Sequence, residues 1–204
     1  MLEIREAVLN DNLAAVKEPA TWLAERTAPD GAPDTWNRWM GDLHASTEAA
    51  ADAKDLKSAA QAVGQLGEAC GARPTALGVT PTFTQSQPPQ TASAVPIHMA
   101  VHHWAADRLW EGLIGPPDEA WRAGVAALQA EPLEVTSLLK EGVIADEIVA
   151  LTKTVHAPID EGPGRAQVVG TILAACADCH SKTRASTKAA PTDPPAEPPA
   201  RPPG

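Results

Sequence analysis

Near the end of this chain, three residues have side chains and a spacing suited to binding a cofactor or metal. They are Cys176, Cys179 and His180, in the run Cys176-Ala177-Asp178-Cys179-His180. A C-x-x-C-H run is the attachment signature of a c-type haem. On a helix, two thiols three residues apart can each add to a vinyl group of one porphyrin, and the imidazole that follows is brought to the iron. We therefore expect one covalent haem c per chain, held by both thiols, with His180 as the proximal iron ligand.

Other kinds of cysteine site use the same residue types. A thioredoxin-like dithiol needs its first thiol near a helix N-terminus, where the helix dipole lowers the thiol pKa, whereas Cys176 falls toward the end of a predicted helix. A structural zinc site needs four ligands, and only Cys70 and scattered histidines are left to complete it. Redox thiols, zinc and inert core cysteines stay open beside haem.

The residues before the motif supply an apolar face. Val169, Leu173, Cys176 and His180 follow one another at intervals of four, three and four, so they share one side of a helix. This spacing predicts that the preceding helix forms part of a haem wall.

The elements that must position these residues are helical. Apolar residues recur at helical spacing between proline-rich stretches, and Ala, Leu, Glu and Gln dilute the β-branched residues. The sequence predicts an all-α fold, with Asp and Asn at several helix N-caps. The expected helices span residues 2–10, 12–26, 34–53, 55–71, 97–113, 117–129, 132–156 and 164–183.

The chain also contains an internal similarity. Residues 60–70 align with residues 166–176 and share Ala, Gln, Val, Gly, Ala and Cys at matching positions. We expect two tandem helical-bundle repeats. In the first repeat Arg73 and Pro74 stand where Cys179 and His180 stand in the second, so we expect the first to be a degenerate repeat without haem, with Cys70 a buried apolar residue.

Twenty prolines divide the chain. Their distribution predicts a degenerate repeat over 1–73, a Pro-rich linker over 74–96 and a haem-binding helical domain over 97–184. The predicted tail over 185–204 is too proline-rich for a helix or a core, so we expect it to be disordered.

The other axial side of the haem has three candidates, Met99, His102 and His103. They lie at i, i+3 and i+4, hence on one side of the predicted helix over 97–113. Any of them could reach the iron or shape the distal pocket, and His102 is favoured slightly because small residues follow it. The nearby Asp107, Arg108 and Glu111 are expected to stay solvated.

A C-x-x-C-H pentapeptide in the last helix of an all-helical domain resembles the class II c-type cytochromes, the cytochrome c prime group. The resemblance covers roughly residues 97–184 and rests on the motif and topology. It implies a four-helix bundle with the haem between helices, His180 on its proximal side and the 97–113 helix crossing its distal side. It also implies electron transfer or the binding of small gases.

The formal net charge is -10, from 16 basic and 26 acidic residues. Nucleic-acid and anionic-membrane binding need clustered Lys and Arg, so neither is expected. No apolar run approaches the roughly 18 to 20 residues that cross a bilayer. No nucleophile with a base, paired carboxylates or phosphate loop is visible, so we expect no enzyme.

The expected function is electron transfer to an unidentified redox partner, and a homodimer is compatible with the sequence. A haem-based binder or sensor of small gases and a haem-less structural or assembly module are the alternatives. Haem c attachment in bacteria takes place outside the cytoplasmic membrane, so the motif predicts a periplasmic or otherwise extracytoplasmic protein. The first residues, 1–6, lack the basic and apolar regions of a leader; we give the motif more weight than this conflict.

Overall fold

The computed structural model describes residues 1–34, 36–76, 81–83, 87–89, 95–115, 118–130 and 164–189. This part of the chain contains seven α-helices and no strand, which confirms the predicted all-α fold. The helices are α1 (Leu2–Leu9), α2 (Leu13–Ala24), α3 (Trp36–Ala51), α4 (Leu56–Ala76), α5 (Val95–Ile114), α6 (Asp118–Ala130) and α9 (Arg165–Ala189). The predicted helix over 132–156, most of the predicted linker (77–80, 84–86 and 90–94) and residues 190–204 lie outside the described residues.

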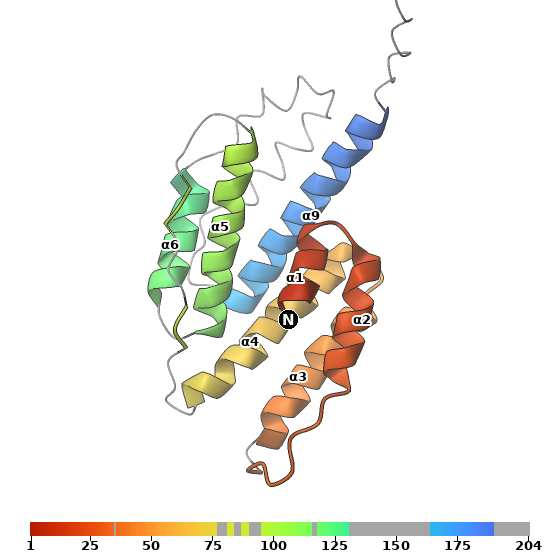
Figure 1. Ribbon diagram of the computed structural model, residues 1–204, viewed down its shortest axis with the longest axis vertical. Helices are drawn as coiled ribbons and strands as arrows, with labels where there is room; N and C mark the ends of the chain where they lie inside the picture. The colour runs from red at the N-terminus through yellow and green to blue at the C-terminus, as the bar shows by residue number, and fades with distance from the viewer. Residues whose placement is uncertain are drawn as a thin grey trace, which may run out of the picture.

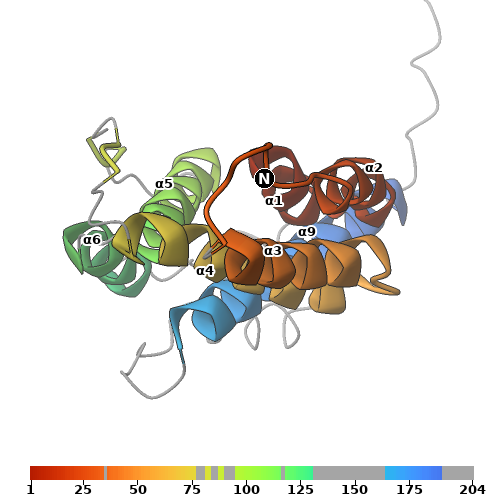
Figure 2. The same ribbon diagram turned by 90° about the horizontal axis from the view of Figure 1, so that it is seen from below.

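Helix α4 lies at the centre of the arrangement. It packs against α9, α3 and α5, and α5 in turn packs against α6 (Figure 1). In the view from below, α5 and α6 lie together at one end of the molecule, and α1, α2 and α3 lie toward the other (Figure 2). The short helix α1 contacts α2, α4 and α9. None of the described helices is long and apolar enough to cross a membrane.

Two glycines let α4 and α9 cross closely. A Cβ atom on Gly64 would lie 2.2 Å from the carbonyl oxygen of Ala166, and one on Gly170 would lie 2.9 Å from the Cα of Gln61. Position 61 on α4 is near 170 on α9, and position 64 is near 166, so the helices run antiparallel. A larger residue at either glycine would push the two helix backbones apart.

The core joins both ends of the chain. One cluster of buried side chains includes Ile4 and Val8 of α1, Leu66 of α4, Leu109 of α5 and Leu173 of α9. Burial of such side chains, at about 25 cal/mol per Å² of apolar surface, is the main force holding the helices together. Residues from both predicted repeats therefore share one core, and the domain boundaries at 73 and 97 stay predictions.

The helix starts follow the predicted caps. The Asn12 side chain accepts a hydrogen bond from Ala15 N at the start of α2, and Asp55 Oδ1 accepts one from Ser58 N (2.7 Å) at the start of α4. Both carboxylate and amide oxygens satisfy backbone N–H groups that have no partner within the helix.

Two helix ends differ from the prediction. Helix α4 continues past Gly71 to Ala76, because Gly71 permits close packing instead of ending the helix: its Cβ would lie 2.5 Å from Leu113 O of α5. Helix α9 continues to Ala189, so residues 185–189 are helical and the expectation that the tail cannot form a helix is wrong for them.

The tryptophans are not all core residues. Trp110 of α5 is buried, whereas Trp22 of α2 is 56% exposed. The Trp22 ring stacks on the Arg26 guanidinium at 4.1 Å from the ring centroid, which gives it a polar partner at the surface.

Candidate functional site

The motif residues lie in the middle of α9, on the side that faces the rest of the protein. Val169 and Leu173 are buried in the core, and Cys176 and His180 are partly buried one and two turns further on. The face predicted from their spacing therefore points inward. Helix α9 continues well beyond the motif, so the motif does not lie at the helix end.

Both motif thiols are held in the protonated form. Burial raises the pKa of Cys176 to about 12, and its neighbour Cys179 adds to this effect. Burial and the charge of Asp178 raise the pKa of Cys179 as well. A thioredoxin-like pair needs a lowered thiol pKa at a helix N-terminus, and these thiols have neither feature. The geometry thus argues against redox thiols.

The His180 imidazole contacts a helix from the other end of the chain. Its Nδ1 lies 2.6 Å from the carbonyl oxygen of Leu9, the last residue of α1. A carbonyl oxygen only accepts hydrogen bonds, so Nδ1 carries the proton, and in the neutral ring the lone pair is on Nε2. Imidazoles that bind metals commonly hold their second nitrogen in this way.

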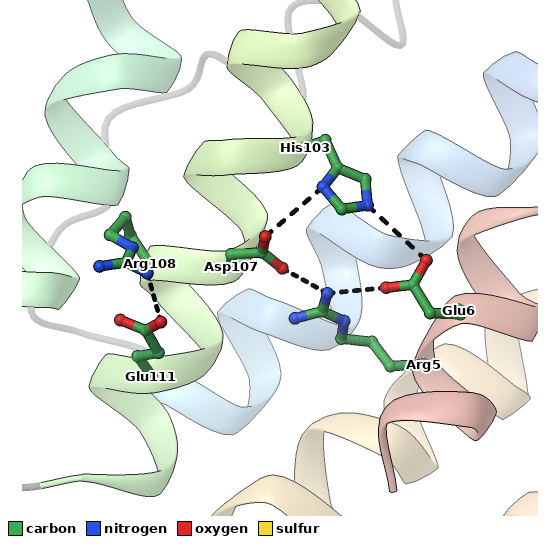
Figure 3. A network of polar contacts seen from close by, with 6 residues as sticks. All are labelled: Arg5, Glu6, His103, Asp107, Arg108 and Glu111. Carbon is green, nitrogen blue, oxygen red and sulfur yellow. Dashed lines mark hydrogen bonds and ion pairs between the residues drawn. The ribbon is translucent and has the colours of Figure 1, made fainter. Parts of the chain in front are cut away.

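The three distal candidates on α5 differ in their surroundings. His103 is exposed: its Nε2 lies 3.6 Å from Glu6 Oε2 on α1 and its Nδ1 lies 3.5 Å from Asp107 Oδ2 (Figure 3). Met99 and His102 are partly buried. His102 and Ala106, a buried residue, are four positions apart and hence on one side of α5. The structure therefore separates His103 from His102, although sequence spacing grouped them.

A network of charged residues next to His103 was not found by the sequence analysis. Arg5 of α1 is only 3% exposed, and its guanidinium Nη2 pairs with Glu6 Oε1 (2.8 Å) and with Asp107 of α5 (Figure 3). The guanidinium also lies 5.8 Å from the ring centroid of Trp110. The available signal was a single Arg between Ile4 and Glu6, in a short helix whose other charged residues are acidic.

Two more charges expected in solvent are covered by the fold. Arg108 is buried and pairs with Glu111, one turn along α5. Burial raises the pKa of Glu111, and the Arg108 charge opposes that shift without cancelling it. The prediction that these two residues stay solvated is wrong; they are covered because neighbouring helices pack over this part of α5.

The first-repeat counterpart of the motif lies on α4. Burial raises the pKa of the Cys70 thiol to about 11, and its Sγ contacts Met1 Sδ. Cys70 is partly buried against the core, close to the expected role of a small apolar residue. Arg73 and Pro74, which replace the second thiol and the imidazole, lie within the same helix.

Helix α1 connects several of these residues. Its side chains Arg5 and Glu6 reach α5, and the carbonyl of its last residue, Leu9, accepts from His180 of α9. Within the described ranges, no group of three or more His, Cys, Asp or Glu side chains is arranged to hold a metal ion. Comparison with protein-family models, curated proteins and solved structures finds no match to this chain.

Proposed function

We propose that this chain is a c-type cytochrome that carries one covalent haem on Cys176 and Cys179, with His180 as the proximal iron ligand, and that it acts in electron transfer. The observation that carries the proposal is the C-x-x-C-H run on an inward face of α9. The haem, when bound, supplies a one-electron Fe(III)/Fe(II) couple. The protein is a carrier, with no catalytic residues of its own.

The side chains of α9 suit this role. The two thiols are three residues apart on one helix, and thioether formation needs no lowered thiol pKa in the folded state if attachment precedes folding. Val169 and Leu173 provide apolar surface next to the thiols. The His180 tautomer places the ring lone pair on Nε2, the atom that would ligate iron.

For the distal side we propose His102 or Met99. Their partly buried positions on α5 support this choice, whereas the ring nitrogens of His103 face Glu6 and Asp107. We expect His102→Ala to perturb the absorption spectrum, or the affinity for carbon monoxide, more than His103→Ala does. Equal and negligible effects of the two changes and of Met99→Ala would remove α5 from the distal side.

The two-repeat architecture belongs to the same proposal. Gly64 and Gly170 occupy matching positions of the two aligned segments, and each approaches the other segment. These reciprocal contacts support a tandem duplication in which the first repeat is degenerate and the second resembles the class II c-type cytochromes. A Pro-rich linker and a Pro-rich tail complete this arrangement.

We further propose a periplasmic or otherwise extracytoplasmic location, because haem c attachment in bacteria takes place there. The partner is an unidentified redox protein, nucleic acid is not a partner, and a homodimer is compatible with this role. The net charge of -10 favours a partner with a basic contact surface.

The test is the optical spectrum of the full chain purified from a host that attaches haem c. We expect covalent haem, low-spin six-coordinate ferric iron and rapid reduction by small reductants. Five-coordinate iron would contradict electron transfer and would indicate that the protein binds small gases. Absence of covalent haem would overturn the proposal and leave a structural or assembly module.

A further inference from the structure

Helix α1 contacts both helices that the proposed haem site uses, α5 and α9. Ile4 and Val8 anchor it in the core with no exposed surface. Its other faces make polar contacts: Arg5 and Glu6 with α5, and the Leu9 carbonyl with α9. A displacement of α1 would therefore change both sets of contacts together.

The contact with α9 involves an atom that helix geometry leaves without an intrahelical partner. The last four carbonyls of an α-helix have no N–H four residues further on, and Leu9 is the last residue of α1. The Nδ1–H of His180 donates to this carbonyl at 2.6 Å, a short distance for an N–H···O bond. The bond sets both the tautomer and the orientation of the His180 ring.

The contact with α5 depends on a buried charge. Arg5 is 3% exposed, and a cation so far from water is stabilised only by a close anion. Asp107 of α5 supplies that anion, and Glu6 supplies a second one at 2.8 Å. Arg5 and Leu9 are four residues apart, so the ion pair fixes α1 about one turn before the Leu9 carbonyl.

We propose that Arg5 is a positioning residue for His180: its ion pair with Asp107 holds α1 in the place where the Leu9 carbonyl accepts the Nδ1 proton of His180. The consequence for iron rests on the proposed function. A ring that donates from Nδ1 is a more basic ligand, and a more basic ligand stabilises ferric iron and lowers the midpoint potential.

The first arm of the test follows the ring proton of His180 by NMR in full-length protein labelled with ¹⁵N-histidine. It uses the haem-free chain or, where haem is attached, the diamagnetic ferrous form bound to carbon monoxide. In the wild type we expect a protonated Nδ1 whose proton exchanges slowly. In Arg5→Met we expect exchange roughly tenfold faster, the ratio expected for loss of one ordinary hydrogen bond, and in Arg5→Lys partial recovery.

The matched control is Arg165→Met. Arg165 lies at the opposite end of α9, where it pairs with Asp118 and donates to Gly112 O (2.8 Å). Its loss removes another interhelical Arg–Asp ion pair, a more exposed one, without touching α1. We expect unchanged His180 proton exchange in this variant. Asp107→Asn removes the anionic partner of Arg5 instead of Arg5 itself. This variant replaces Arg5→Met if Arg5→Met does not fold.

The second arm measures the midpoint potential of the haem-bearing chain. We expect an upward shift in Arg5→Met and no shift in Arg165→Met. An unprotonated Nδ1 in the wild type, unchanged proton exchange in both Arg5→Met and Asp107→Asn, or equal exchange in the Arg5 and Arg165 variants would overturn the proposal. Absence of haem from the wild type would instead contradict the proposed function, and the NMR arm would still test the role of Arg5.

Discussion

The segments around Cys70 on α4 and around Cys176 on α9 have similar sequences but different chemical capacity. Both cysteines are partly buried, and burial raises the pKa of both thiols. Only α9 continues with a second cysteine and a histidine, whereas α4 continues with Arg73 and Pro74. Helix packing in this protein thus depends on small and apolar residues that the segments share, and the proposed haem chemistry depends on two positions that they do not share.

Helix α1 distinguishes the two segments further. Met1, the residue before its first turn, contacts Cys70 of α4, and its last residue, Leu9, contacts His180 of α9. One short helix therefore covers an apolar thiol in one segment and orients an imidazole in the other. The two segments therefore differ in the side chain that each places near α1, Cys70 or His180, as well as in the C-x-x-C-H motif.

The largest expected effect concerns covalent haem. In a haem-c-competent host, we expect Cys70→Ala to keep a full haem stain on a denaturing gel, because the first segment lacks a second thiol and an iron ligand. The double change Cys176→Ala and Cys179→Ala should abolish the stain. Loss of the stain from the Cys70 variant would show that the α4 segment takes part in haem attachment.

The next effect concerns thiol reactivity in the haem-free chain. Only the thiolate is nucleophilic, and the pKa values of about 12 for Cys176 and about 11 for Cys70 lie above the ordinary value of 9.0. We expect alkylation at mildly alkaline pH to be about a thousandfold slower than in urea at Cys176 and about a hundredfold slower at Cys70. Mass mapping of alkylated peptides measures both rates.

The same shifts fix the sign of a pH effect. A folded-state thiol pKa above the unfolded one stabilises the fold below the unfolded pKa, and this stability is lost as pH rises from about 9 toward the folded pKa. Cys176→Ser should make the alkaline decline in stability shallower. Equal alkylation rates in native and urea-unfolded chain would contradict the burial of both thiols.

Much of the helical framework could be predicted from local sequence. Asn12 and Asp55 begin helices as expected from their capping side chains, and the inward position of Val169 and Leu173 follows from helical spacing. The end of α4 could not be predicted this way. In its local sequence Gly71 resembles a helix C-terminal residue, but in the structure it lets the backbone of α5 pack close to α4. That contact depends on a helix far away in the sequence.

The charged network was missed for the same reason. Arg5 and Asp107 are separated by most of the described chain, and no local pattern indicates that they meet. Spacing on α5 likewise grouped His103 with His102, whereas contact with Glu6 of α1 sets His103 apart. Spacing identifies which residues share a helix face; it does not identify the helix that covers that face.

A smaller effect is expected from the glycines at which α4 and α9 cross. In Gly64→Ala the new Cβ would lie 2.2 Å from Ala166 O, whereas in Gly170→Ala it would lie 2.8 Å from Gln61 Oε1 and 2.9 Å from Gln61 Cα. The helix backbones must therefore shift in both variants, and further in Gly64→Ala. Overpacking of this kind costs about 1–3 kcal/mol, and we expect the larger loss at Gly64. Urea unfolding of the haem-free chain measures it.

The control for this comparison is Gly41→Ala in α3, where a Cβ meets nothing within 4 Å. Alanine in an exposed helix interior is more favourable than glycine by about 0.5–1 kcal/mol, so this variant should gain stability. A similar gain in Gly64→Ala would show that α4 and α9 do not approach as closely as described.

The smallest effect is expected where the two segments end. After Cys70, helix α4 packs against α5 through Gly71, so Gly71→Ala should lower the melting temperature.

Residues 190–204 contain Pro191, Pro194 and five further prolines. Their deletion should leave both the melting temperature and the absorption spectrum nearly unchanged, because such a sequence buries little apolar surface. Deletion from residue 185 also removes the last helical turn of α9 and should lower the melting temperature slightly more. A drop of many degrees from the shorter deletion would mean that the region beyond α9 packs on the body of the protein, as the end of α4 does.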